Sequence, residues 1–242
     1  AHDLLASRTT LFQLHRNYWC NQGFELMEPT FADVLDARRI VSKYLKATPF
    51  FKSIPLSKRL GFEAYVKFEN LQPTGAFKVR GGINLISKLS EEEKTRGVIT
   101  ASTGNHGLSI AYASALFGVQ AIVGAPIGSN PYKIRTIKDL GALVELHGKD
   151  FDEARIWVES KAREKGYRYI HSANEPLLIA GVGTLYYEIL EELPDVDAIF
   201  VPVGGGSGAS AACIVAKTIN PSIKVIGVQS EGAPAVYESW KS

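Results

Sequence analysis

From Glu63 to the end of the chain, short β-branched runs alternate with longer segments of helical periodicity. Such runs are typical of strands buried on both faces, and the segments between them are long enough to cross over a sheet. The predicted strands cover residues 64–68, 97–100, 120–123, 142–146, 167–170, 198–201 and 224–228. The helices predicted between them include residues 106–117, 152–165, 177–193 and 208–218. This alternation predicts the α/β class, with mainly parallel sheet and helices on both faces.

Several predicted helix ends carry the residue types expected there. Thr30 is placed to cap a helix that begins at Phe31, and Ser90 with Glu93 forms a capping box for another. Glycines that can end a helix follow three of the helical segments, at Gly118, Gly141 and Gly166.

Composition excludes several classes of protein. The chain has 242 residues, 45% hydrophobic and 21% charged, which is ordinary for a globular protein. A net charge of +2, with basic and acidic residues interspersed, gives no electrostatic reason to expect a nucleic-acid or membrane partner. No apolar stretch is as long as a membrane span, and the N-terminus lacks the layout of a signal peptide. The two cysteines, Cys20 and Cys213, suggest neither a disulfide framework nor a zinc site, so we expect a cytoplasmic protein.

One lysine stands in an unusual setting. Residues 73–82 read Pro-Thr-Gly-Ala-Phe-Lys-Val-Arg-Gly-Gly, which places Lys78 among apolar residues and glycines at the start of a predicted helix. A lysine removed from water has a lowered pKa, and its neutral amine can attack a carbonyl carbon. The alternative is a side chain that lies along the helix and keeps its ammonium in water.

A second segment, residues 100–107, follows a predicted strand and opens a predicted helix. Backbone N–H groups at such a helix start lack partners and attract an anion such as a carboxylate or a phosphate. Ser102, Thr103 and Asn105 add polar side chains at the same place. The alternative is ordinary capping and turn chemistry.

A third segment, residues 201–210, runs from a predicted strand through glycines into a helix of small residues. Glycines allow the backbone to close around a phosphate at a helix N-terminus. The segment is not a P-loop, because no Gly-Lys-Ser/Thr ends it. Gly204, Gly206 and Ala209, with Glu231 after the next strand, also fit a weak dinucleotide-binding pattern, which leaves a nicotinamide-dependent oxidoreductase as an alternative.

Together, a Schiff-base lysine and a phosphate-binding loop describe pyridoxal phosphate. On these three segments the chain resembles the fold-type II pyridoxal-phosphate enzymes, specifically the threonine dehydratase and serine racemase group. The resemblance runs from about Glu28 to the end of the chain. It implies a tryptophan-synthase-β-like fold of two three-layer αβα domains. Residues 1–92 and 177–242 would form the large, cofactor-binding domain, and residues 93–176 the small one.

The resemblance also implies roles for single residues. Lys78 would carry the cofactor and act as the catalytic base, and Asn105 would contact the ring hydroxyl of the cofactor. The substrate carboxylate would lie at Ser102, Thr103 and Gly104, with His106 beside them. The remaining cofactor-binding residues would be Phe77, Gly204, Gly205, Gly206, Ser207 and Gly208.

The implied reaction is loss of water and ammonia from threonine, serine or a related β-hydroxy amino acid, which leaves a 2-oxo acid. Reprotonation from the opposite face would instead racemise the substrate, and Thr103 occupies the position where racemases of the group carry a serine. Gln229 stands where some members have an acidic metal ligand, so we expect no metal.

Family members are typically longer and act as homo-oligomers. The part beyond Ser242 would supply the contact to the pyridine nitrogen, so we expect a C-terminally truncated large domain. An inactive fragment is therefore a further alternative.

Overall fold

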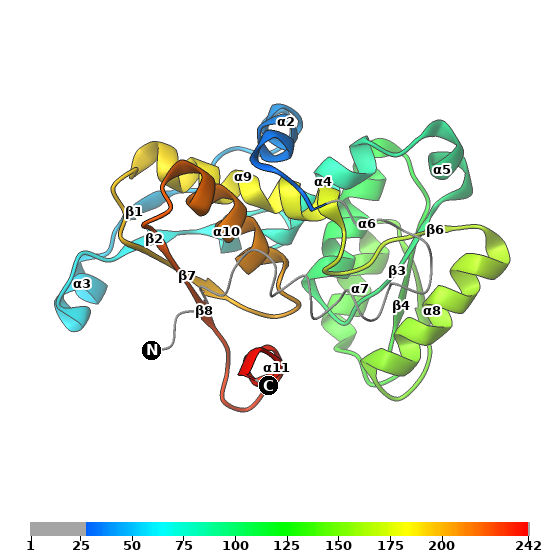
Figure 1. The fold of residues 1–242 in the computed structure, drawn as a ribbon. Coiled ribbons are helices and arrows are strands. Elements are labelled where there is room, and N and C mark those ends of the chain that lie inside the picture. Colours follow the sequence, from blue (N-terminus) through cyan, green and yellow to red (C-terminus); the bar gives the residue numbers. More distant parts are fainter. Residues whose placement is uncertain (1–27, 242) are drawn as a thin grey trace.

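The computed structural model describes residues 28–241. Residues 1–27 of the predicted large domain, including Cys20, lie outside the described residues. A four-stranded sheet with its helices occupies one end of the molecule, and two two-stranded sheets lie toward the other (Figure 1). None of the helices within residues 28–241 is both long and apolar enough to span a bilayer.

From β2 onward, the strands and helices of the described part follow one another as the alternation predicts. The strands are β1 (Phe50–Lys52), β2 (Tyr65–Lys67), β3 (Val98–Ala101), β4 (Ala121–Ala125), β5 (Leu143–Leu146), β6 (Arg168–Tyr169), β7 (Ala198–Pro202) and β8 (Lys224–Val228). The helices are α2 (Phe31–Val41), α3 (Ile54–Leu60), the 3₁₀-helix η2 (Glu69–Leu71), α4 (Lys78–Ser87), α5 (Glu91–Arg96), α6 (Asn105–Phe117), α7 (Pro131–Asp139), α8 (Phe151–Lys165), α9 (Pro176–Glu192), α10 (Ser207–Ile219) and α11 (Ala235–Lys241).

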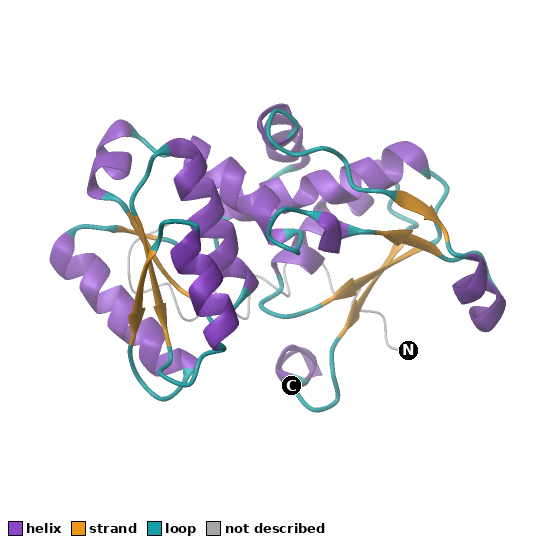
Figure 2. Ribbon diagram, turned by 180° about the vertical axis from the view of Figure 1, so that it is seen from behind, coloured by secondary structure: helices purple, strands orange, loops and turns teal. Residues whose placement is uncertain are grey.

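The four-stranded sheet is parallel, in the order β5-β4-β3-β6. Successive side chains of a strand point to opposite faces. Val98 accordingly packs in the core shared with α4 and α6, whereas Ile99 packs against Val158 of α8. Helices therefore cover both faces, which makes this sheet the middle of three layers (Figure 2).

The other strands form two separate pairs. β7 and β8 are parallel and joined by the crossover helix α10, as predicted. The strand predicted at residues 64–68 instead pairs antiparallel with β1, which the sequence pattern did not reveal. β1 has only three residues and a burial pattern without alternation, so it carries no period-two signal.

Helix ends were predicted well. Thr30 and Ser90 both form capping boxes. Gly118 and Gly166 end their helices in the left-handed conformation, and Gly141 lies two residues after α7 with φ of +88°. A left-handed residue at this position suits glycine, because glycine has no Cβ to clash with the preceding turn.

Helix α9 joins the two ends of the molecule. Leu178 belongs to the core that contains α4 and α6, while Ile179 and Val182 belong to the core around α10. Helix α4 packs closely on both α6 and α9. The division into domains at residues 92 and 177 stays a prediction, because α4 and α6 share one core across it.

Candidate active site

The four-stranded sheet has one topological switch point, between β3 and β6. From β3 the chain proceeds to β4 and β5 on one side, and it then crosses to β6 on the other side of β3. In open parallel sheets, ligands bind in the crevice outside the carboxyl ends of the strands at such a point. The segments that leave these two ends are residues 102–107 and residues 170–175.

Lys78, the first residue of α4, reaches this place. Its ammonium donates to the backbone oxygen of Ser172, at 3.1 Å, and to the hydroxyl oxygen of Ser207, at 2.6 Å. Burial lowers the pKa of Lys78 from 10.5 to about 8. Lys78 thus connects the segment after β6 with the glycine-rich segment after β7, and its amine is partly neutral near physiological pH.

The glycine-rich segment uses three glycines for different reasons. Gly206 precedes α10 with φ of +95°, a conformation that favours glycine. A Cβ on Gly205 would lie 3.1 Å from the Cβ of Ala173, and one on Gly208 would lie 3.3 Å from the ring of Phe77. No side chain of the described residues caps α10, and the N–H groups of its first turn have no intrahelical acceptor, so they offer an anion-binding site.

The turn after β3 is organised by Ser102. Its hydroxyl oxygen accepts hydrogen bonds from the N–H groups of Gly104, at 3.1 Å, and Gly107, at 2.8 Å. Gly104 is the N-cap of α6 and makes no side-chain cap. Thr103 and Asn105 are exposed, so their side chains are accessible to a ligand. The N–H groups of Asn105 and His106 lie in the first helical turn, where no intrahelical acceptor exists.

His106 supports this turn from inside the protein, with 5% of its surface exposed. The Thr100 hydroxyl donates its single proton to the backbone oxygen of Ile170, at 2.7 Å, so it accepts from Nε2 of His106, at 2.8 Å. Burial, with smaller contributions from Lys78 and His171, lowers the pKa of His106 to about 3. His106 is therefore neutral at physiological pH and lies within electrostatic range of Lys78.

The backbone of Lys78 is held by close approach of neighbouring helices. The Ser109 hydroxyl of α6 donates to the backbone oxygen of Lys78, at 2.6 Å. A Cβ on Gly82 would lie 2.7 Å from the backbone oxygen of Ser109, and one on Gly181 of α9 would lie 2.5 Å from that of Arg80. The glycines permit contacts that fix the start of α4 against α6 and α9.

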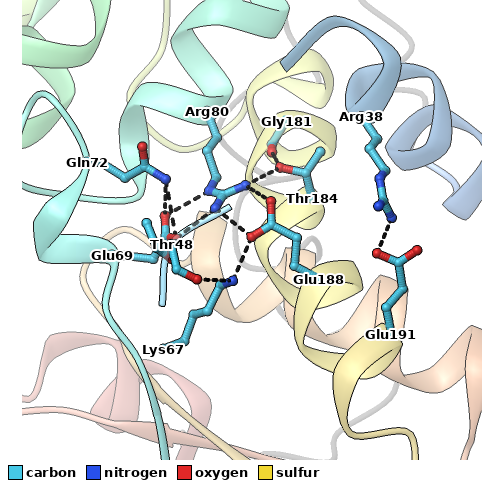
Figure 3. Close-up of polar contacts among 10 residues, drawn as sticks. All are labelled: Arg38, Thr48, Lys67, Glu69, Gln72, Arg80, Gly181, Thr184, Glu188 and Glu191. Atoms are coloured by element: carbon cyan, nitrogen blue, oxygen red, sulfur yellow. Dashed lines mark hydrogen bonds and ion pairs between the residues drawn. The ribbon is translucent and has the colours of Figure 1, made fainter. Parts of the chain in front are cut away.

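Arg80, two residues after Lys78 on α4, forms a buried ionic network (Figure 3). Its guanidinium makes paired hydrogen bonds to Glu69, both at 2.8 Å, and to Glu188, at 2.7 and 2.8 Å, and a further one to Thr184 at 3.1 Å. Lys67 forms an ion pair with Glu188 at 2.7 Å. Burial would lower the pKa of Arg80, but the two carboxylates outweigh burial and raise it. The network joins β2, η2, α4 and α9.

The structure brings several predicted residues together. Lys78 contacts Ser207, and Phe77 packs beside Gly208. The turn with His106 follows the carboxyl end of β3, next to the end of β6 that leads to Ser172, the other partner of Lys78. Gln229 binds the backbone oxygen of Val203 through its amide nitrogen, and among the described residues no three His, Cys, Asp or Glu side chains are arranged to hold a metal ion.

Sequence reasoning missed the contribution of the segment after β6, and of Thr100, Ser109 and the partners of Arg80. The position of residues 170–175 after a predicted strand was the one available signal. The alternation of strands and helices along the sequence does not specify which strands are neighbours in the sheet.

Comparison with known proteins places these features in a family. A family model described as pyridoxal-phosphate dependent enzyme matches residues 41–242. An L-threonine ammonia-lyase from Thermotoga maritima is 43% identical over 212 residues, which are 88% of this chain and 53% of that protein. The processed form of threonine deaminase isoform 2 from Solanum lycopersicum superposes with a TM-score of 0.81 at 35% identity, over 90% of this chain and 62% of that one.

A maize serine racemase superposes with a TM-score of 0.84 at 30% identity, over 88% of this chain and 65% of that one. The chain spans about half the length of the Thermotoga relative. The resemblance inferred from three short segments is confirmed, and the nicotinamide-dependent alternative is set aside. The chain belongs to the family of pyridoxal-phosphate dependent enzymes.

Proposed function

We propose that this chain is the cofactor-binding part of an ammonia-lyase that converts threonine, serine or a related β-hydroxy amino acid to a 2-oxo acid and ammonia. The observation that carries the proposal is the amine of Lys78, held with a lowered pKa between Ser172 and Ser207 at the switch point. The named threonine ammonia-lyase and threonine deaminase relatives support the choice of substrate.

The residues present fit a phosphorylated pyridine cofactor. The glycine segment and the uncapped N-terminus of α10 offer backbone N–H groups to a phosphate without a metal. The lysine nearest this segment is held in a site where its neutral form is accessible. We assign cofactor binding to Lys78, Phe77, Asn105, Gly204, Gly205, Gly206, Ser207 and Gly208.

We assign the substrate carboxylate to the turn of residues 102–106. The N–H groups of Gly104 and Gly107 already donate to the Ser102 hydroxyl, so at this turn the carboxylate would meet the N–H groups of Thr103, Asn105 and His106. Neutral His106 would support this turn from behind. In this arrangement the carboxylate sets the orientation of the substrate relative to Lys78.

When bound, pyridoxal phosphate supplies an electron sink that stabilises negative charge at the substrate Cα. Nζ of Lys78, neutral in part near its pKa of about 8, is the base for the Cα proton. The β-hydroxyl leaves with a proton as water. A water molecule then hydrolyses the dehydrated amino acid to the 2-oxo acid and ammonia.

A second candidate is racemisation, favoured by the exposed position of Thr103 in the carboxylate turn. A hydroxyl there could return a proton to the face opposite Lys78. The serine racemase and aspartate racemase structures among the neighbours agree with this candidate. For either activity we propose a cytoplasmic homo-oligomer with the domain division 1–92 and 177–242 against 93–176.

The test is to incubate the purified chain with pyridoxal phosphate, reduce it with borohydride, and locate the bound cofactor by mass spectrometry. We expect it on Lys78 and expect none in Lys78→Ala. Incubation with L-threonine and L-serine should then yield 2-oxo acid, and D-enantiomer would indicate the second candidate. Cofactor fixed to another lysine, or no oxo acid from any β-hydroxy amino acid, would contradict the proposal.

A further inference from the structure

We propose that His171 is a positioning residue, whose imidazole holds the loop of residues 171–175 in the shape that presents the Ser172 carbonyl to Lys78. The expected effect of His171 on cofactor binding rests on the proposed function. The effect of His171 on the shape of the loop does not depend on the cofactor.

The hydrogen bonds of His171 are unusual for a histidine. Its Nδ1 accepts from the backbone N–H groups of Ala173, at 3.0 Å, and Asn174, at 2.8 Å. An Asn or Asp side chain often makes such a bond to the backbone two residues on, as an Asx-turn. Here an imidazole nitrogen takes that place, and it can accept only while it carries no proton.

The loop is fixed at its other end by ionic bonds. The Glu175 carboxylate receives two hydrogen bonds from the guanidinium of Arg168, both at 2.9 Å, and it also accepts from the N–H of His171, at 3.4 Å. The imidazole within the loop and the carboxylate at its end therefore both hold the loop. Among the described residues, the imidazole is the side chain that accepts from the N–H groups of Ala173 and Asn174, the two residues directly after Ser172.

This loop contacts two parts of the proposed cofactor site, Lys78 and the glycine-rich segment. Its Ser172 carbonyl accepts from Lys78 at 3.1 Å. Ala173 is buried and limits the space beside Gly205. If the two N–H groups lost their acceptor, the peptide units around Ser172 and Ala173 would be free to turn, and the carbonyl would leave Lys78.

The test compares His171→Ala with His171→Asn, which keeps an acceptor at the Asx-turn position. The matched control is His147→Ala, since His147 is exposed and stacks on Trp157. In the chain without cofactor, amide exchange at Ala173 and Asn174 should be about tenfold faster or more in His171→Ala, and within about threefold of wild type in His171→Asn. Should His171→Ala not fold, His171→Gln replaces it, because its acceptor lies one methylene farther out.

Two further measurements separate positioning from a purely structural role. Acylation of Lys78 by acetic anhydride, followed by mass spectrometry, should be at least about threefold faster in His171→Ala, because the loop no longer covers the amine. Pyridoxal phosphate should bind about tenfold more weakly to His171→Ala than to His171→Asn or His147→Ala.

Unchanged exchange or unchanged acylation in His171→Ala would overturn the inference, as would a His171→Asn variant that behaves like His171→Ala. If the wild type itself failed to bind the cofactor, the proposed function would fail, whereas the exchange and acylation results would still decide the role of His171.

Discussion

A half-buried lysine has to be explained by its surroundings, and those of Lys78 are unusual. Both of its hydrogen-bond partners, Ser172 and Ser207, offer neutral oxygens. Burial is the cause of its lowered pKa, so the folded protein disfavours the ammonium that the unfolded chain carries at pH 7. The protonated side chain of Lys78 therefore lowers the free energy of unfolding, and such unfavourable groups are common at functional sites.

This cost predicts the behaviour of Lys78→Met. A pKa that falls from 10.5 to about 8 on folding destabilises the protonated folded form by up to about 3 kcal/mol, and the lost hydrogen bonds offset part of that gain. We expect the variant without cofactor to gain about 1–3 kcal/mol in free energy of unfolding at pH 7. The difference is full below pH 8, where both states are protonated, and decreases as pH rises toward 10.5.

Urea denaturation of both proteins between pH 7 and pH 10 measures this difference. Lys46→Met is the control, because Lys46 is exposed and should change the free energy of unfolding little at any pH. A Lys78→Met protein less stable than wild type across the whole range would show that Lys78 is not a buried charge.

At the scale of elements, the site depends on how α4 fits between α6 and α9. Gly81, Gly82 and Gly181 are the points of closest approach, where backbone of one helix meets backbone of the next. Glycine within a helix is unfavourable by about 1 kcal/mol relative to alanine, so three such residues require a packing reason. The contacts provide that reason.

Gly181→Ala tests this packing explanation, because helix propensity and close packing predict opposite changes in the free energy of unfolding. Helix propensity alone would stabilise the protein by about 1 kcal/mol, whereas a Cβ at 2.5 Å from the Arg80 carbonyl oxygen should cost about 1–3 kcal/mol or more. We expect net destabilisation in urea denaturation, together with weaker binding of pyridoxal phosphate. Gly128→Ala, where a Cβ meets nothing within 4 Å, should leave both quantities nearly unchanged.

At the scale of the molecule, the network of Arg80 connects parts that are far apart in sequence. Lys67 and Arg80 supply two cations, and Glu69 and Glu188 supply two carboxylates, all largely buried. A complete network of this kind adds little net stability, but loss of one member leaves a buried charge without its partner. We infer that it fixes the relative positions of β2, α4 and α9.

Glu69→Gln should therefore be strongly destabilising, by about 3 kcal/mol at pH 7. Burial raises the pKa of Glu69, but the hydrogen bonds and charge of Arg80, together with hydrogen bonds from Thr48 and Gln72, outweigh burial and lower it below 4.5. The stabilisation is full above pH 4.5 and is lost as pH falls through the lower, folded value. The difference between wild type and variant in chemical denaturation should narrow accordingly in acid.

In Glu69→Gln the cations Lys67 and Arg80 share the single carboxylate of Glu188, so the double variant Glu69→Gln with Arg80→Met should recover part of the lost stability by removing the excess cation. Glu63→Gln, at the exposed pair with Lys52, serves as the control and should have little effect. An additive double variant would contradict the account of a coupled network.

Residue patterns predicted the strands from β2 onward and several of the helices, and they suggested the chemistry of three segments. Local periodicity specifies strands and helices, and Lys78, the turn at Ser102–His106 and the loop at Gly204–Gly208 each carry their chemistry in adjacent residues. The same locality explains the misses. β1 is too short to show a period, and the segment around His171 carries no recognisable motif.

Which of these segments meet follows from the packing of the folded chain. In the folded chain, β6 pairs with β3, and Lys78 donates to Ser172 and Ser207. Arg80 forms ion pairs with Glu69 of η2 and Glu188 of α9. The physical reason is that strand order and helix packing are chosen by burial summed over the whole core, whereas propensity and capping act within a few residues.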